Sequence, residues 1–550
     1  MRDWREFFPL HTPRKEQVEA LDAICKHYID GKRFVVVQAP TGTGKSAIAV
    51  CVSRWMAANF PVGEDEAYGG VILTSQKTLQ DQYTGDFSAI AADLRSSSNY
   101  PCAWADGITC GETLRITKTT GGWPCKTEPS CQKGLDCPYK GAKTRFIGST
   151  VGITNYSYLL SEATYAHSLK VRQLLVCDEA HGIEESIRKF VTVSVDESLS
   201  RELKLVLPDR ESNDDDVLKW MDEKYLPTIK KAVATLEKVI LTHHGKRKKI
   251  PAQLRSLARQ HEFLDKKMCQ ANRWKSDAAE LRTEYVLIRN EGSVNQERSI
   301  ELKPLNVSAA ANDVLYSRGT RVLMMSATIL DFDTFARSSG IPKSQSAFVD
   351  VKSSFDPSHF GIVYRPVALM NKGSIEISIP KIVDQVREIL KAHPNEKGIL
   401  HASNYSVCRA FKSLNDPRLL IQDTGADRER ILEHHINSPD PTVIVSPSMM
   451  EGLDLKDDFG RFQVICKVPF PSLGDPVIKR LMEANRNWYS WRTVLTLVQA
   501  VGRCVRNEDD WAKTYILDEC FTSLFSRNTR MFTSTFSEMT VENIDKKRKK

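Results

Sequence analysis

The segment APTGTGKS, residues 39–46, has the residue types of a loop that binds the phosphates of a nucleotide. Glycines in such a loop let backbone N–H groups converge on phosphate oxygens, and the start of the following helix adds a favourable field. Lys45 is placed to reach the β- and γ-phosphates, and the Ser46 hydroxyl to bind Mg²⁺. The strict pattern begins with glycine, whereas this loop begins with alanine, a departure that leaves the GKS end intact. The predicted nucleotide-binding residues here are Ala39, Thr41, Gly42, Thr43, Gly44, Lys45 and Ser46.

The tetrapeptide DEAH, residues 178–181, follows an apolar run and complements that loop. Asp178, at the end of a strand, can hold Mg²⁺ directly or through a coordinated water. Glu179 is then placed to orient or deprotonate the water that attacks the γ-phosphate. Alone, such a pair could be only a helix N-cap. Its occurrence together with a phosphate loop favours nucleotide hydrolysis.

The segment QAVGRCVR, residues 499–506, offers Gln499 and two arginines on one helical face. Arg503 and Arg506 could approach a nucleotide from a second domain and stabilise the charge of the transition state. The alternative is a pair of surface arginines that form ion pairs.

Five of the thirteen cysteines lie close together in the sequence, between residues 102 and 137. In an intracellular protein, clustered thiols favour a metal site over disulfides. Zinc sites usually pair cysteines two to four residues apart, and no such pair occurs in this cluster. Thiolates at wider spacing suit an iron–sulfur cluster, while zinc and thiols without a metal are the alternatives. The five candidates are Cys102, Cys110, Cys125, Cys131 and Cys137.

Buried-strand patterns precede most of these polar segments. They occupy residues 34–37, 69–75, 172–181, 321–328 and 442–448, and alternate with helical patterns such as Ile379–Leu390 and Trp491–Val505. This alternation predicts α/β domains with parallel sheets, which bring the carboxyl ends of the strands to one edge.

The composition is that of a soluble globular chain with several cores: 550 residues, of which 41% are hydrophobic and 27% charged. The net charge of +8 is compatible with a nucleic-acid partner. No apolar run is long enough to cross a membrane, and the N-terminal residues MRDWREFFPL do not form a signal peptide. We therefore expect an intracellular protein.

Three further segments complete a pattern: TSQKTLQDQY at 74–83, SAT at 326–328 and EGLDL at 451–455. With the phosphate loop, DEAH and QAVGRCVR, they follow the order seen in superfamily 2 helicases. The chain is similar to the XPD/DinG group of iron–sulfur helicases in its cysteine cluster and in four short segments. These segments are SNYPC at 98–102, CPY at 137–139, NYSYLL at 155–160 and VPFPSLGDP at 468–476.

The resemblance implies an α/β fold with two RecA-like motor domains and two inserts in the first. We assign residues 1–95, 146–195 and 311–350 to the first motor domain and 351–540 to the second. An iron–sulfur insert would occupy residues 96–145, a helical arch without buried strands 196–310, and a basic tail 541–550.

The resemblance also implies further site residues. Gly452 and Asp454 would help to close the cleft on ATP, and Ser326 and Thr328 would couple hydrolysis to domain movement. Adenine would be contacted by Arg14 and Gln17, and the nucleic-acid strand by Thr74, Tyr83, Asn155, Tyr156 and Ser403. The implied ligands of a [4Fe–4S] cluster are Cys102, Cys125, Cys131 and Cys137, with Cys110 as the alternative.

From these features we expect an ATP- and Mg²⁺-dependent DNA helicase that moves 5′→3′ on single-stranded DNA and unwinds tailed duplexes as a monomer. Its compartment would be the cytoplasm of a bacterial or virus-infected cell. The alternatives are an ATPase of the same class that acts on RNA–DNA hybrids, R-loops or bound proteins, a binding scaffold with an inactive motor, and a redox-sensing DNA-binding regulator.

Overall fold

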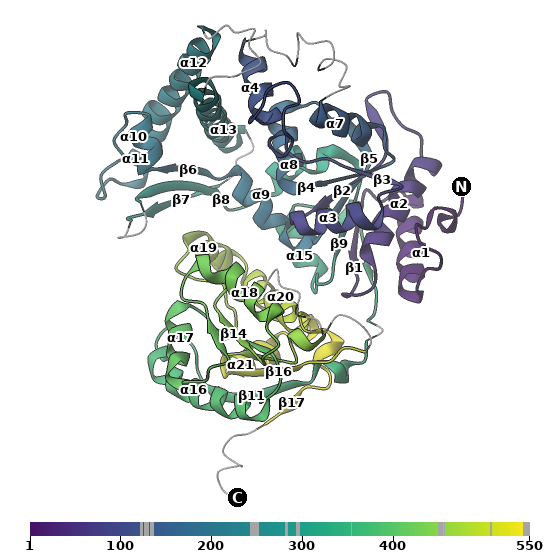
Figure 1. The fold of residues 1–550 in the computed structure, drawn as a ribbon, viewed down its shortest axis with the longest axis vertical. Helices are drawn as coiled ribbons and strands as arrows, with labels where there is room; N and C mark the ends of the chain where they lie inside the picture. The colour runs from purple at the N-terminus through teal and green to yellow at the C-terminus, as the bar shows by residue number, and fades with distance from the viewer. Residues whose placement is uncertain are drawn as a thin grey trace, which may run out of the picture.

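Two α/β domains form the molecule, and the inserts extend from the first of them (Figure 1). The computed structural model describes residues 1–120, 125, 131, 137–242, 252–280, 284–292, 297–353, 355–448, 455, 457–505 and 509–542. In the described part of the chain, no helix is long and apolar enough to cross a membrane.

The first domain is built on a seven-stranded parallel sheet with the strand order β10-β1-β9-β5-β2-β4-β3. Because parallel strands are covered on both faces, their sequences read as continuous apolar runs. The predicted strands at 34–37, 69–75, 172–181 and 321–328 correspond to β1, β2, β5 and β9. The strands are β1 (Phe34–Gln38), β2 (Glu66–Thr74), β3 (Ala91–Asp93), β4 (Val151–Asn155), β5 (Val171–Asp178), β9 (Gly319–Ser326) and β10 (Ser346–Asp350).

Strand β1 shows how helices cover both faces of this sheet. Val35 and Val37 point into a core shared with α1 (Lys15–Ile29) and α2 (Lys45–Asn59). Phe34 and Val36 point into the opposite core. The helices around that second core are α8 (Tyr156–Ser161), α9 (Ile183–Val191), α14 (Ser308–Val314) and α15 (Phe332–Ser339).

The second domain repeats this architecture with a seven-stranded parallel sheet of order β13-β14-β12-β15-β16-β11-β17. Its strands are β11 (Ile362–Ala368), β12 (Gly398–His401), β13 (Leu419–Ile421), β14 (Val443–Ser446), β15 (Phe462–Ile465), β16 (Lys513–Asp518) and β17 (Thr540–Val541). Its helices are α16 (Ile375–Ala392), α17 (Tyr405–Ala410), α18 (Arg428–Asn437), α19 (Pro476–Ala484), α20 (Arg486–Val501) and α21 (Cys520–Arg527). The two parallel sheets confirm the predicted fold class.

The segment predicted as a helical arch contains strands as well as helices. Strands β7 (Tyr285–Asn290) and β8 (Ser299–Pro304) pair antiparallel with each other, and β8 also pairs with β6 (Val193–Asp196). The expectation that this segment lacks strands was therefore wrong. Its helices are α10 (Glu197–Glu202), α11 (Asp214–Trp220), α12 (Leu226–Thr242) and α13 (Ala252–Glu280).

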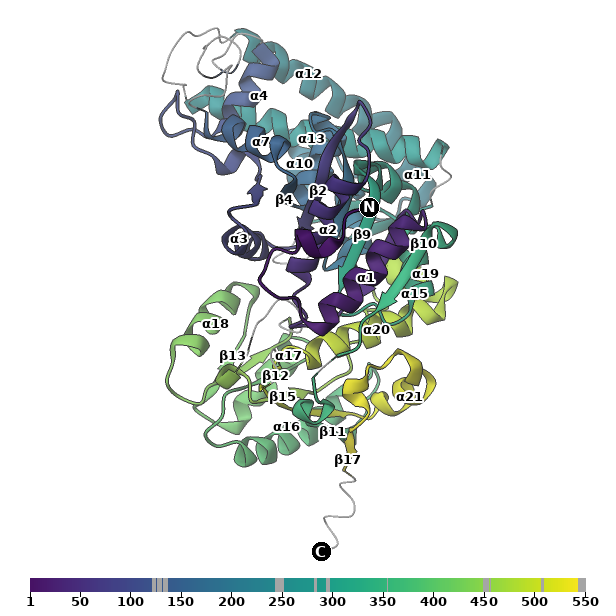
Figure 2. The same cartoon turned by 90° about the vertical axis from the view of Figure 1, so that its right-hand side faces the viewer.

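The cysteine-rich insert lies beside the long arch helices (Figures 1 and 2). Its helix α4 (Cys110–Thr120) contacts both α12 and α13, whereas α7 (Pro138–Gly148) packs on the motor-domain sheet. A hydrogen bond of 2.9 Å joins Arg115 Nη1 to Asp265 Oδ2, and Arg259 forms an ion pair with Glu112. The two inserts therefore contact each other.

Helix α20 of the second domain packs directly on the first. Its residues Trp488, Trp491 and Leu495 belong to the core on one face of the first sheet. The indole nitrogens of Trp488 and Trp491 donate to Glu184 Oε2 (3.1 Å) and to the backbone carbonyl of Ile329 (2.7 Å). Since α20 leads directly into QAVGRCVR, this contact places that segment beside the first domain.

Candidate active site

The phosphate loop joins β1 to α2, and its glycines have the backbone that such a loop needs. Gly42 and Gly44 have φ values of 83° and 78°, a left-handed conformation that is open to glycine at little cost. Helix α2 begins at Lys45, so its first backbone N–H groups face the loop. The Lys45 ammonium donates to the Ala39 carbonyl at 3.2 Å. The loop therefore offers backbone donors and a lysine at one helix terminus.

Asp178 is the last residue of strand β5, which belongs to the same sheet as β1, the strand before the phosphate loop. Its side chain is buried, and the residue is 3% exposed. Its Oδ1 accepts from the Glu179 backbone N–H at 3.0 Å, and its Oδ2 accepts from the Tyr83 hydroxyl at 2.9 Å. Burial and the adjacent Glu179 raise the pKa of Asp178 to about 6, against the opposing influence of Lys45. The Tyr83 hydroxyl also interacts with the Ser46 side chain. Ser46 and Asp178 thus lie around one hydroxyl, and their oxygen donors fit a Mg²⁺ ion.

Glu179 follows in a strained backbone conformation. Its φ and ψ are 51° and 47°, values that a non-glycine residue seldom adopts and that occur at functional sites. The side chain remains 36% exposed and lies 3.4 Å from His181 Nδ1. A carboxylate held in this way can act on a water molecule at the mouth of the site.

A chain of hydrogen bonds leads from DEAH across to the second domain. His181 Nδ1 lies 2.9 Å from Ser326 Oγ, which accepts from the Thr328 N–H at 3.1 Å. Thr328 Oγ1 then accepts from Gln499 Nε2 at 3.0 Å. Burial lowers the pKa of His181 to about 4, so the imidazole is neutral at physiological pH. The predicted segments DEAH, SAT and QAVGRCVR therefore form one connected network.

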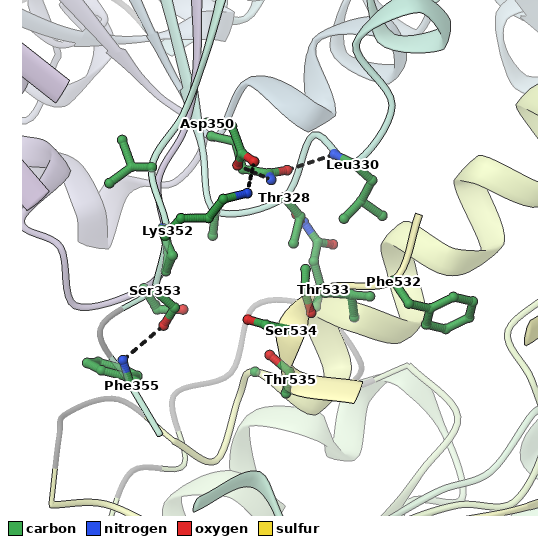
Figure 3. A pocket seen from close by; sticks show the side chains of 18 of the residues that line it. Thr328, Leu330, Asp350, Lys352, Ser353, Phe355, Phe532, Thr533, Ser534 and Thr535 are labelled. Atoms are coloured by element: carbon green, nitrogen blue, oxygen red, sulfur yellow. Dashed lines mark hydrogen bonds and ion pairs between the residues drawn. The ribbon is translucent and has the colours of Figure 1, made fainter. Parts of the chain in front are cut away.

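A cavity of about 300 Å³ lies at this junction, between the two domains (Figure 3). Pro40, Thr41 and Glu179 line it from the first domain, and Gln499 and Arg503 from the second. The Oε1 atom of Gln499 is buried there without a hydrogen-bond partner. A buried polar atom beside a cavity is a position where a ligand can supply the missing bond.

Sequence reasoning missed several residues that line this cavity. Gln38 accepts from the N–H groups of Ile329 and Leu330, both at 2.7 Å, and donates to Asp350 Oδ1 at 2.8 Å. Lys352 forms an ion pair with Asp350 at 2.7 Å. Residues 532–535 lie across the cavity from Asp350 and Lys352 (Figure 3). None of these residues belongs to a motif, and only the polar end of β1 could have indicated Gln38.

Arg14 and Gln17 lie at the start of α1, next to the phosphate loop. Gln17 is 3% exposed, donates to the Gly44 carbonyl at 3.3 Å and accepts from the Arg14 N–H at 2.9 Å. Arg14 donates to the Gly42 carbonyl. In this structure both side chains therefore support the loop, whereas the prediction gave them contacts with adenine.

Thr74 and Asn155 end the paired strands β2 and β4, and Tyr156 begins α8 directly after Asn155. Tyr83 lies within helix α3 (Lys77–Asp86), which follows β2. Tyr83 is 0% and Tyr156 6% exposed, and their hydroxyls bind Asp178, so neither ring presents a face on which a base can stack. Thr74 is buried, and Asn155 caps α8. Ser403, in the second domain, has a buried hydroxyl without a hydrogen-bond partner.

The five clustered cysteines occupy one region of the insert. The thiols of Cys110 and Cys137 are 3.9 Å apart, and Cys110 also interacts with Cys102. The Lys140 ammonium donates to the backbone carbonyls of both Cys125 and Cys131. Within the described ranges, no group of three or more His, Cys, Asp or Glu residues is arranged to hold a metal ion. Thiols are ligands that suit iron or zinc, and the side chains brought together here are those of Cys102, Cys110 and Cys137.

Three predicted site residues, Gly452, Asp454 and Arg506, lie outside the described residues, as does the basic run Lys546–Lys550.

Comparisons with known proteins agree with this geometry. Residues 381–539 match a family described as a helicase C-terminal domain, and residues 10–205 one described as type III restriction enzyme, res subunit. The chain is 22% identical to the ATP-dependent DNA helicase YoaA of Escherichia coli, over 93% of this chain and 92% of YoaA. It is 26% identical to the ATP-dependent DNA helicase DinG of Photobacterium profundum, over 40% of this chain and 34% of DinG.

Solved structures agree in fold. An XPD helicase structure aligns with a TM-score of 0.62 at 15% identity, over 97% of this chain and all of the other (100%). Xpd4 of S. tokodaii aligns with a TM-score of 0.56 at 14% identity, over 96% of this chain and 100% of its own. Together, the sequence relatives and the fold confirm the predicted resemblance to XPD/DinG-like superfamily 2 helicases.

Proposed function

We propose that this XPD/DinG-like superfamily 2 helicase is an ATP-dependent DNA helicase that moves 5′→3′ on single-stranded DNA and unwinds duplex DNA. The observation that carries the proposal is the hydrogen-bond network from DEAH through Ser326 and Thr328 to Gln499. Through this network, the groups that act on the γ-phosphate are in contact with the second domain. The comparisons lend no support to the alternatives based on hybrids, protein displacement or redox sensing.

Residues from both domains contribute to ATP hydrolysis. Lys45 and the loop N–H groups bind the phosphates, and Glu179 orients and deprotonates the attacking water. Ser46 and Asp178 would hold Mg²⁺, which neutralises phosphate charge when it is bound. Gln499, Arg503 and Arg506 complete the site from the second domain, and Gly452 and Asp454 close it. Arg503 lies at the cavity between the domains, where positive charge can stabilise the transition state.

Movement of the domains would convert hydrolysis into steps along the strand. Helix α20 is suited to transmit this movement, because one end packs in the first domain and the other leads to Gln499 and Arg503. Nucleotide binding would draw Gln499 and Arg503 onto the phosphates, and loss of the γ-phosphate would release them.

The cysteine-rich insert would hold a [4Fe–4S] cluster through Cys102, Cys125, Cys131 and Cys137, with Cys110 as the alternative ligand. The cluster would stabilise a part of the chain that has little apolar core of its own. Its position against the arch helices supports a role of both inserts in guiding the strand and separating the duplex.

The partners in this proposal are single-stranded and tailed duplex DNA, and the working unit is a monomer inside a bacterial or virus-infected cell. The proposal is tested by ATP hydrolysis with and without single-stranded DNA, comparing the wild type with Glu179→Gln. We expect strong stimulation by DNA in the wild type and loss of hydrolysis in the variant, with DNA binding retained. A wild-type rate of ATP hydrolysis that is the same with and without single-stranded DNA would contradict the proposal.

A further inference from the structure

Tyr83 lies in a segment predicted to contact nucleic acid, yet its hydroxyl forms a hydrogen bond with a residue of the candidate active site. The side chain is 0% exposed and donates to Asp178 Oδ2 at 2.9 Å. The other carboxylate oxygen of Asp178 accepts from the Glu179 N–H. Tyr83 is thus the side chain that fixes one of the two oxygens of the proposed Mg²⁺ ligand.

We propose that Tyr83 is a positioning residue that links helix α3 (Lys77–Asp86) to Asp178, so that DNA held at the start of α3 sets the geometry of the Mg²⁺ site. This inference rests on the proposed function. It deepens that function by naming a connection between the DNA path and the nucleotide site within the first domain.

The strand order brings the connected groups together. In the sheet, β2 lies between β4 and β5, so Thr74, Asn155 and Asp178 end three neighbouring strands at the same edge. Helix α3 leaves this edge after β2, and α8 leaves it after β4. Helix α3 therefore starts beside the strand that carries Asp178, and α8 starts one strand further along the same edge.

A second tyrosine strengthens the connection. Tyr156, the first residue of α8, donates through its hydroxyl to the backbone carbonyl of Asp178 at 2.9 Å. The preceding Asn155 donates to Gln80 Oε1 of α3 at 3.2 Å. The two helices are thus joined to each other and to the backbone and side chain of Asp178.

Helix α3 has one accessible end and one anchored face. At its start, Ser75, Gln76, Lys77 and Thr78 are exposed, whereas Gln80 and Tyr83 are buried. Tyr83 follows Lys77 by six positions along the helix, a rise of about 9 Å. Fewer than two turns of helix lie between them. If bound DNA displaces the exposed end of α3, the displacement would therefore be passed to Asp178.

Tyr83→Phe tests this link, because it removes the hydroxyl and keeps the buried ring. The matched control is Tyr316→Phe, which removes another buried hydroxyl of the same domain, one that donates to the Ser339 carbonyl at 2.7 Å. For each protein we would titrate Mg²⁺ against binding of a fluorescent non-hydrolysable ATP analogue. We would also measure DNA-stimulated hydrolysis and binding of an oligothymidylate.

In Tyr83→Phe we expect the half-saturating Mg²⁺ concentration to rise about fivefold or more, because a buried carboxylate loses a donor. DNA stimulation should fall by a similar factor, while oligothymidylate binding stays within about twofold of the wild type. Tyr316→Phe should match the wild type in all three measurements. A Tyr83→Phe protein with unchanged Mg²⁺ dependence and unchanged stimulation would overturn the inference.

The two proposals can fail separately. If the wild type shows no DNA stimulation, the proposed function fails, while the Mg²⁺ titration still tests the bond between Tyr83 and Asp178. If Tyr83→Phe melts far below Tyr316→Phe, Tyr156→Phe replaces it, and a rise in the Mg²⁺ requirement is again expected. No change in that variant would count against the inference.

Discussion

Replacing Gln499 by leucine removes the amide that joins the second domain to Thr328 of the first, while nearly preserving the size of the side chain. In the structure, Gln499 Nε2 donates to Thr328 Oγ1 at 3.0 Å, and Gln499 Oε1 is buried without a partner beside the cavity. The substitution therefore removes one bond within the protein and one acceptor oxygen that a donor in the bound state, such as water or a ribose hydroxyl, can use.

The size of the effect follows from these two losses. A neutral hydrogen bond contributes about 1 kcal/mol, and a further neutral bond to the Gln499 carbonyl oxygen, from a water molecule or a ribose hydroxyl, about 1 kcal/mol more. Because about 1.4 kcal/mol corresponds to a factor of ten, Gln499→Leu should lower kcat/KM for ATP by about 30-fold. Thr328→Val removes only the bond between the domains and should cost about fivefold.

A double-mutant cycle in DNA-stimulated ATP hydrolysis isolates the shared bond. Thr328→Val combined with Gln499→Leu should show a coupling of about 1 kcal/mol, since either change alone already breaks the bond. The control cycle pairs Gln499→Leu with Thr493→Val, whose hydroxyl donates within α20 to the Tyr489 carbonyl at 2.8 Å. Coupling below about 0.3 kcal/mol in the first cycle would refute the contact between the domains as a functional link.

Burial lowers the pKa of His435 to about 4, so its neutral form is the one that the fold stabilises. The contribution of neutral His435 to the free energy of unfolding should be complete above pH 6.5 and should be lost as the pH falls toward 4. When urea unfolding at pH 7.5 is compared with unfolding at pH 5, the free energy of unfolding of the wild type should fall by about 2 kcal/mol more than that of His435→Gln. Cys131→Ser should lose most of its iron and visible absorbance after anaerobic purification, whereas Cys520→Ser should keep both; equal iron in the two proteins would contradict the ligand assignment. Glu112 accepts from the Thr109 N–H at 2.9 Å at the start of α4 and also pairs with Arg259, so Glu112→Ala, which removes both contacts, should destabilise the insert by about 1 kcal/mol or more. Limited proteolysis should then cut this variant faster than the wild type within the insert, and unchanged cleavage would argue against the capping contact.

Much of the nucleotide site could be predicted because its residues are local in sequence. The phosphate loop needs a strand, glycines and a helix in succession, and β1, Gly42, Gly44 and α2 supply them. The same is true of Asp178, whose position follows from the apolar strand before it.

Contacts between distant segments could not be predicted in this way. The hydroxyl of Tyr83 meets Asp178 only because β2 and β5 are neighbours in the sheet, and tyrosines of this kind look the same in sequence whether they stack on bases or fill a core. The role of Gln38 likewise depends on β9 and β10 lying on either side of β1.

The strands of the arch were missed for a different reason. The segment β8 alternates buried Ile300 and Leu302 with Glu301 and Lys303, which is the pattern of a half-buried strand. The long charged helices around it carry a stronger periodic pattern than this short segment. The two-residue period nevertheless indicates β8, and its partner β7 has the same alternation at Val286 and Ile288.

Strand displacement on matched duplexes with either a 5′ or a 3′ single-stranded tail tests the central claim most directly. The protein would be purified without oxygen and assayed with ATP and Mg²⁺ beside Lys45→Ala. Unwinding from the 5′ tail alone, absent in Lys45→Ala, is the predicted result. Unwinding from the 3′ tail, or equal unwinding by Lys45→Ala, would contradict the claim that hydrolysis at this site drives 5′→3′ movement.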